Sequence, residues 1–137
     1  MILVDTGAWV ALFDPHDTAH RRARRILDGI DAPLVTTPAV LTEAFHLLGG
    51  WSRGAEALSE FILAGGVALW FPEGHTLARA FELMRRYSDR PMDFSDATLV
   101  CAAEHFRTTR VFTIDRSDFS TYRARIGRQS RAFRILE

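Results

Sequence analysis

The sequence predicts one α/β domain over residues 1–137, in which a mainly parallel sheet has helices on both faces. Short apolar runs typical of buried strands alternate along the chain with longer segments of helical periodicity. Those longer segments suffice for the crossovers that parallel strands need. The chain has 137 residues, 47% hydrophobic and 25% charged, which are the size and composition of one ordinary globular domain.

The first part of the sequence predicts a strand followed by two helices. The run Ile2 to Asp5 is apolar up to its final carboxylate, as in a strand buried on both faces. A helix is expected from Gly7 to Phe13. A second helix is expected to begin at a cap on Asp17 or Thr18 and to run to Leu27, with four arginines on its outer face.

The next strand and helix are bounded by clear local signals. Pro33 to Thr36 is expected as the second strand. Thr37 and Pro38 predict a helix start, because a threonine hydroxyl can cap free amide groups and proline suits the first helical position. This helix is expected to end at Gly49.

The middle of the chain predicts three further helices and one strand. Ser52 is expected to cap a helix that ends at Gly65, and Val67 to Phe71 reads as the third strand. Apolar residues at helical spacing predict helices over Thr76 to Tyr87 and Phe94 to Phe106.

Two final strands complete the expected sheet. Arg110 to Asp115 is an apolar run that, like the first strand, ends on a carboxylate, and a last short strand is expected at Phe133 to Leu136. In parallel sheets of this kind ligands bind outside the carboxyl ends of the strands, where the strand order reverses. Asp5 and Asp115 are both expected at such ends.

Charge and cysteine content exclude several classes of protein. The 17 basic residues, all arginine, balance 17 acidic ones, which excludes a protein that coats nucleic acid by net charge alone. Cys101 is the only cysteine, so an intramolecular disulfide and a thiolate metal cluster are excluded and a reducing, cytoplasmic location is expected. No uncharged run approaches the roughly 20 apolar residues of a membrane span, and no signal peptide is expected.

Five carboxylates occupy positions where charge is usually avoided. Asp5 and Asp115 follow apolar runs, Glu43 interrupts an apolar helix, and Asp93 and Asp96 stand three apart at a helix start. Each has an ordinary explanation, because an Asp at a helix start commonly caps amide groups and a buried Glu can pair with an arginine. Gathered together, however, carboxylates repel one another and need a cation, and an all-oxygen set suits Mg²⁺ or Mn²⁺ bridged to phosphate oxygens.

Four segments stand out in order along the chain, namely Val4–Trp9, Leu41–Ala44, Met92–Ala97 and Phe112–Phe119. Together they resemble a PIN domain, and more narrowly a VapC-type toxin ribonuclease of a type II toxin–antitoxin module. The resemblance implies an α/β/α sandwich with strand order 3-2-1-4-5. It implies a catalytic and metal-binding set of Asp5, Glu43, Asp96 and, at a more variable position, Asp115. It also suggests three helpers near the metal or phosphate, namely Thr6, Asp93 and Thr113, whereas Asp118 is interpreted as a structural cap.

The resemblance further implies a Mg²⁺- or Mn²⁺-dependent endoribonuclease that forms a homodimer and binds a cognate antitoxin. DNA would be bound only indirectly, through the antitoxin. Phe13, Phe45 and Trp51 are candidates for a hydrophobic surface outside the core. Residues 107–137 carry eight arginines against three acids, which suits a substrate with phosphates, although a solvated basic tail would have the same composition.

Two other functions fit parts of the pattern. Another metal-dependent phosphoesterase, such as an aspartate-based phosphatase, also has an Asp after its first strand, but that chemistry usually needs a second Asp two residues on, where this chain has Gly7. A non-catalytic dimeric binding subunit would use the acids structurally. Metal-dependent cleavage of RNA would distinguish a ribonuclease from both of these alternatives.

Overall fold

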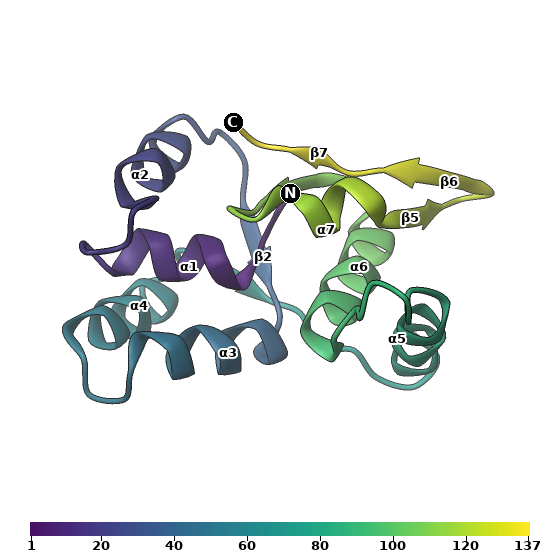
Figure 1. Cartoon of the computed structure of the whole chain (residues 1–137), viewed down its shortest axis with the longest axis horizontal. Coiled ribbons are helices and arrows are strands. Elements are labelled where there is room, and N and C mark those ends of the chain that lie inside the picture. Colours follow the sequence, from purple (N-terminus) through teal and green to yellow (C-terminus); the bar gives the residue numbers. More distant parts are fainter.

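Five parallel strands form the centre of the computed structural model, which describes residues 1–137 (Figure 1). In sheet order they are β3 (Ala68–Leu69), β2 (Leu34–Thr36), β1 (Ile2–Val4), β4 (Arg110–Phe112) and β7 (Arg134–Ile135). In the central strand, Leu3 lies beside Val35 on one side and Val111 on the other. The order 3-2-1-4-5 is therefore confirmed, with β7 as the fifth strand of the sheet.

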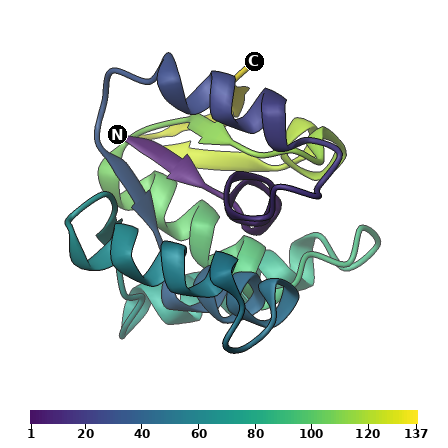
Figure 2. The same ribbon diagram turned by 90° about the vertical axis from the view of Figure 1, so that its left-hand side faces the viewer.

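Seven helices surround these strands. They are α1 (Thr6–Phe13), α2 (His20–Asp28), α3 (Pro38–Leu48), α4 (Arg53–Leu63), α5 (His75–Arg86), α6 (Phe94–Phe106) and α7 (Arg116–Thr121). Figure 2 shows α2 on one side of the strands and α6 on the other, which confirms the expected helices on both faces. No helix in the structure is both long and apolar enough to span a membrane.

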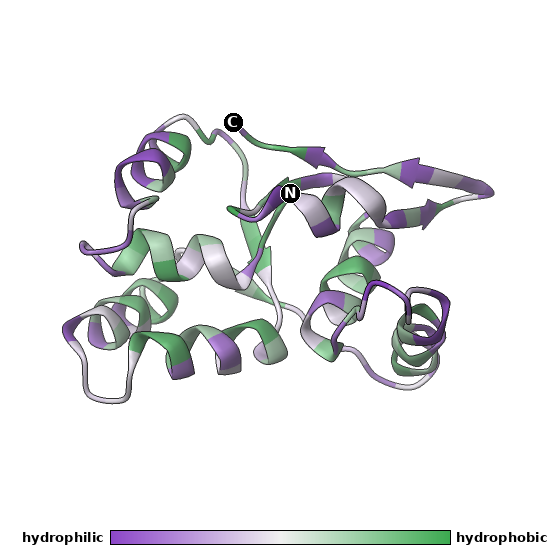
Figure 3. Cartoon of the chain, in the orientation of Figure 1, coloured by the Kyte–Doolittle hydropathy of each residue, from purple (hydrophilic) through white to green (hydrophobic).

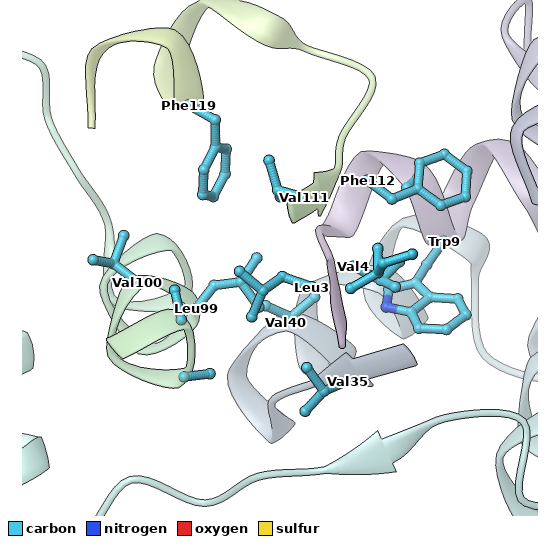
Figure 4. Packing of buried hydrophobic residues seen from close by; sticks show 14 of the residues in the cluster. Leu3, Val4, Trp9, Val35, Val40, Leu99, Val100, Val111, Phe112 and Phe119 are labelled. Carbon is cyan, nitrogen blue, oxygen red and sulfur yellow. The ribbon is translucent and has the colours of Figure 1, made fainter. Parts of the chain in front are cut away.

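The hydrophobic core is built around the central strand. All three residues of β1 are fully buried, and one cluster of 31 buried residues joins the strands to the helices (Figure 4). Trp9 of α1 is fully buried and its indole nitrogen donates to Thr36 Oγ1 at 3.3 Å, which ties α1 to β2. Because β1 is covered on all sides, the residue that follows it is held in a rigid frame.

Two of the expected helix caps are confirmed and one is wrong. Thr37 Oγ1 accepts from Val40 N at 3.4 Å and Ser52 Oγ accepts from Ala55 N at 3.0 Å. Helix α2, however, begins at His20 without a side-chain cap. Asp17 instead accepts from Ala19 N at 2.8 Å in the turn before the helix, since its carboxylate finds a donor two residues on.

The sequence interpretation also missed or overextended several short elements. The strand expected over 67–71 is reduced to the two exposed residues of β3, at the edge of the sheet. Helix α7 and the antiparallel hairpin of β5 (Arg123–Ile126) and β6 (Gln129–Ala132) were not expected. All four residues of β6 are exposed, so the hairpin has little of the apolar alternation by which strands are detected.

Candidate carboxylate centre

The carboxyl ends of β1 and β4 bring Asp5 and Thr113 together. Asp5 N donates to Phe112 O at 3.0 Å, which continues the pairing of the two strands. Asp5 occupies the N-cap position of α1, yet its carboxylate caps no amide. Its Oδ2 instead accepts from the Thr113 hydroxyl at 2.9 Å. Asp5 therefore makes no N-cap hydrogen bond, although the adjacent backbone amide of Thr6 lowers its pKa.

Asp96 faces the same region from the first turn of α6. Its Oδ2 accepts from the Tyr122 hydroxyl at 2.8 Å. Tyr122 is fully buried and follows α7, so a side chain distant in sequence fixes the orientation of this carboxylate. Nothing in the local sequence around Asp96 identifies Tyr122 as its partner.

Glu43 reaches toward the centre from the middle of α3. The Thr6 hydroxyl donates to its Oε1 at 3.4 Å, which joins α3 to the first residue of α1. Glu43 is half-buried and forms no ion pair with an arginine. The structural explanation considered from the sequence, a buried Glu–Arg pair, is thus wrong.

Asp93 caps α6, as its ordinary explanation predicts. Its Oδ1 accepts from Asp96 N at 2.8 Å, and the side chain is exposed. Its negative charge nevertheless raises the pKa of both Asp5 and Asp96. Asp93 therefore lies near the centre while one of its oxygens holds the helix start.

Burial and mutual repulsion raise the pKa values of the two central aspartates. The pKa of Asp5 is raised to about 6, mainly by burial, with smaller contributions from the charges of Asp93 and Glu43. The pKa of Asp96 is raised to about 7 by burial and then by the charges of Asp5 and Asp93. The Thr113 and Tyr122 hydroxyls oppose these shifts. We call Asp5, Glu43 and Asp96 the carboxylate centre, because the charge of a neighbouring carboxylate raises the pKa of each of the two aspartates.

The donor chemistry of the carboxylate centre fits a hard divalent cation. No member forms a salt bridge, so no protein cation neutralises the centre. Carboxylate and hydroxyl oxygens are the ligands that Mg²⁺ and Mn²⁺ prefer. As the side chains lie, no three His, Cys, Asp or Glu residues converge into a group that could hold a metal ion.

The expected position of Asp115 at the end of a strand is wrong. Strand β4 ends at Phe112, and Thr113 is the residue that meets Asp5. Asp115 is exposed and caps α7, because its Oδ1 accepts from Ser117 N at 3.1 Å and from Ser117 Oγ at 2.8 Å. These bonds lower its pKa. A role of Asp115 as a metal ligand stays a prediction.

The expected capping role of Asp118 is wrong, because Asp115 is the N-cap of α7. Burial raises the pKa of Asp118, and its charge in turn raises the pKa of Asp96. It lies in the first turn of α7, so the placement of this unexpected helix brings its charge close enough to affect Asp96. The spacing of three residues between Asp115 and Asp118 is the one sequence signal that could have identified Asp118 as a neighbour of the centre.

A family model and two curated relatives match nearly the whole chain. The model described as "PIN domain" matches residues 2–124. The relative named "Ribonuclease VapC26", from Mycobacterium tuberculosis, is 29% identical over 126 residues, covering 89% of this chain and 92% of that protein. The "23S rRNA-specific endonuclease VapC20" of the same organism is 29% identical over 122 residues, covering 88% and 92%.

Solved structures share the fold over a similar extent. The crystal structure of Mycobacterium tuberculosis VapC20, described as a sarcin–ricin loop cleaving toxin, has a TM-score of 0.78 and 26% identity, covering 85% of this chain and 92% of that one. A toxin–antitoxin complex from Klebsiella pneumoniae has a TM-score of 0.67 and 17% identity, covering 88% and 92%. This second likeness concerns the fold alone.

Proposed function

Because the chain belongs to the PIN domain family, we propose that it is a metal-dependent endoribonuclease and the toxin of a type II toxin–antitoxin module. One observation of this molecule carries the proposal. Asp5 and Asp96 lie near each other with raised pKa values and with no protein cation to neutralise them. With these pKa values protons compete for the centre near neutral pH, whereas a bound cation would keep both carboxylates ionised and could receive a phosphate.

Each residue of the centre has a role in this proposal. Asp5, Glu43 and Asp96 would hold Mg²⁺ or Mn²⁺, with Asp115 or Asp118 completing the set from α7. The bound ion would lower the pKa of a water molecule and stabilise negative charge on the phosphate. The Thr113, Thr6 and Tyr122 hydroxyls orient Asp5, Glu43 and Asp96 respectively. Asp93 fixes the start of α6 and so the position of Asp96.

We propose structured RNA as the substrate. The support comes from VapC20, which is named as specific for 23S rRNA and described as cleaving the sarcin–ricin loop. A stem–loop with the sarcin–ricin sequence is therefore the first RNA to test. Hydrolysis should leave a 5′-phosphate and a 3′-hydroxyl, with water forming the new bond to phosphorus and the 3′-oxygen leaving with a proton.

The proposed partners are a second copy of the chain and a cognate antitoxin, with DNA bound only through the antitoxin. The support is a groove lined by Phe45, Trp51 and Leu63, in which Trp51 and Leu63 are almost fully exposed. Apolar side chains exposed together commonly mark protein interfaces. A cytoplasmic location is part of the proposal, since cellular RNA would be the substrate.

The proposal is tested by incubating the purified protein with the stem–loop, with Mg²⁺ or with EDTA. We expect cleavage with Mg²⁺ that is lost in EDTA and lost to background in Asp5→Asn and Asp96→Asn. Asp28→Asn is the matched control, since it removes the same charge from an exposed site on α2. Circular dichroism checks that the variants remain folded.

Other outcomes identify the alternative functions. Full cleavage by Asp96→Asn would contradict the proposal. Metal-dependent turnover of p-nitrophenyl phosphate without cleavage of any cellular RNA would indicate a different phosphoesterase. Neither reaction, in a protein that forms a stable dimer, would indicate a binding subunit.

A further inference from the structure

A groove with an arginine-rich lining runs between α2 and the C-terminal segment. Its first part has a volume of about 320 Å³ and is lined by Arg22, Arg25, Thr113 and Arg116. Past Arg25 it continues into a hollow of about 380 Å³ that is lined by Arg110 and Arg134. We call these two parts together the α2 groove. Figure 3 shows hydrophilic residues along α2 and at the start of β7, and Figures 1 and 2 place α2 near the C-terminus.

One end of the α2 groove lies next to the carboxylate centre, on the other side of Thr113. Thr113 lines the groove, and its hydroxyl donates to Asp5 Oδ2 at 2.9 Å. Arg22 Nη2 donates to Ile114 O at 3.4 Å, which holds α2 against the segment that follows β4. A single side chain therefore separates the groove from the aspartate that would hold the metal.

The arginines of the groove are incompletely neutralised. Arg22, Arg25 and Arg134 form no ion pair. Arg116 pairs with Glu137 at 2.7 Å, and Arg110 pairs with Asp31 at 3.7 Å, both at exposed positions. Five arginines thus face two carboxylates, and a guanidinium group can bind a phosphate through two parallel hydrogen bonds.

The arginines of the hairpin are less suited to this role. Arg123 donates from Nη1 to the carbonyls of Ser120, Thr121 and Tyr122, so its guanidinium is engaged in holding the end of α7. The positive strip expected over residues 107–137 is therefore divided by the fold. Only part of it joins the arginines of α2, which are distant in sequence.

We propose that the α2 groove binds the RNA backbone beside the phosphodiester that is cut, with Arg22 and Arg25 as positioning residues. This inference rests on the proposed function and identifies the side from which the substrate enters the centre. The two arginines are three residues apart, on one face of α2, and phosphates that they bind would continue directly to the carboxylate centre. Glu137 competes with the RNA for Arg116.

The test compares two double variants on the same helix. Arg22→Gln/Arg25→Gln removes the two groove arginines, whereas Arg21→Gln/Arg24→Gln removes two exposed arginines with the same spacing that line no part of the groove. Both are made in the Asp96→Asn background and mixed with a fluorescein-labelled RNA stem–loop in EDTA, so binding is measured without cleavage. Fluorescence anisotropy gives Kd at several salt concentrations.

We expect the groove variant to bind about tenfold more weakly and to lower the slope of log K against log salt by about 1 to 2, while the control variant changes both little. In the cleaving protein the same substitutions should raise KM more than they lower kcat. Glu137→Gln should tighten binding by freeing Arg116. A merely structural role of Arg22 would leave the salt slope unchanged.

Two results would overturn the inference. Equal weakening by both double variants would mean that α2 acts only through its net charge. Unchanged binding in the groove variant would mean that the RNA enters elsewhere, whether or not the wild-type protein cleaves RNA. Because the binding assay needs neither metal nor cleavage, failure of the groove and failure of the proposed activity remain distinguishable.

Discussion

At the scale of single residues, the contacts of each aspartate decide its role. Asp93 and Asp115 both stand before a helix and accept from one of its first amide groups, so each carboxylate stabilises a helix start. Asp5 stands in the same position before α1 but makes no N-cap hydrogen bond, and its Oδ2 accepts from the Thr113 hydroxyl. Asp96 lies inside a first turn and accepts from Tyr122. Asp5 and Asp96, whose pKa values are raised to about 6 and about 7, are the two that accept from side chains of distant segments.

The raised pKa values predict that the metal-free protein loses stability as the pH rises. A carboxyl group with a higher pKa in the folded chain binds protons more tightly when folded, so its ionisation destabilises the fold. The contribution is largest below the usual pKa of aspartate, about 4, and is lost as the pH rises through about 6 and 7. In EDTA, the midpoint of thermal unfolding should fall between pH 5 and pH 8.

Asp96→Asn tests the source of that pH dependence. The neutral side chain should raise the unfolding midpoint by several degrees at pH 8 and by less at pH 5. The matched variant Asp28→Asn, at an exposed position, should reproduce the wild-type profile. A variant as pH-sensitive as the wild type would contradict the assignment of the shift to Asp96.

Tyr122→Phe should weaken the proposed ribonuclease activity without unfolding the protein. The ring of Tyr122 remains to fill the core, but the hydroxyl that donates to Asp96 is lost. Because that hydrogen bond lowers the pKa of Asp96, its removal should raise that pKa and shift the rise of activity to higher pH. We expect the Mg²⁺ concentration that gives half-maximal activity to rise about tenfold, as measured from activity against metal concentration at several pH values.

Tyr87→Phe is the control for this variant. The Tyr87 hydroxyl accepts from Arg123 N and has no contact with the carboxylate centre. It should leave the pH profile of cleavage unchanged. Equal profiles for Tyr122→Phe and the wild type would show that the hydroxyl does not tune Asp96.

At the scale of elements, close packing of helices positions the centre. Helix α1 contacts α3, which carries Glu43, and also contacts α4. The approach of α4 to α1 is so close that a Cβ on Gly54 would lie 2.5 Å from Phe13 O and 3.1 Å from Leu48 Cδ2. The absence of a side chain at this one position permits the contact.

Gly54→Ala should therefore destabilise the protein although alanine favours helices. Overpacking of this kind costs about 1 to 3 kcal/mol, which exceeds the gain of about 1 kcal/mol in helix propensity. Gly50→Ala is the control, since nothing lies within 4 Å of its Cβ position. Urea unfolding measures both, and a more stable Gly54→Ala would contradict the packing argument.

At the scale of the whole molecule, the sheet order brings the centre together. The chain runs outward from β1 to β2 and β3, then returns to β4 on the other side of β1. The strand order therefore reverses beside Asp5, at the place where parallel sheets commonly bind ligands. Glu43 and Asp96 reach this place from helices that follow β2 and precede β4.

Mg²⁺ should stabilise the whole molecule, and more at pH 8 than at pH 6. The ion would bind the ionised carboxylates, so protons compete with it below the raised pKa values of Asp5 and Asp96. We expect the midpoint of thermal unfolding to rise by several degrees at millimolar Mg²⁺ and pH 8. Asp5→Asn should abolish the rise, whereas no rise in the wild type would count against a metal site.

Local sequence signals predicted much of the fold. The apolar runs around Leu3 and Val111 and the helical periodicity over 94–106 are properties of neighbouring residues, so their elements could be assigned from the sequence. The hairpin of residues 123–132 has mostly exposed residues, and Gly127 turns it with a positive φ of 63°. Its strands pair through backbone hydrogen bonds, so the pattern of side chains does not reveal them.

By itself, the sequence determined where most strands and helices lie, apart from α7 and the β5–β6 hairpin, and which carboxylates stand at unusual positions. These depend on periodicity and on residue types within a few positions of each other. Only the tertiary structure decided that Asp5 makes no N-cap hydrogen bond while Asp93 and Asp115 cap helices, that Tyr122 orients Asp96, and that the arginines of α2 lie beside the C-terminal segment. The reason is physical: burial, repulsion and hydrogen bonding act between residues that the chain separates and the fold brings together.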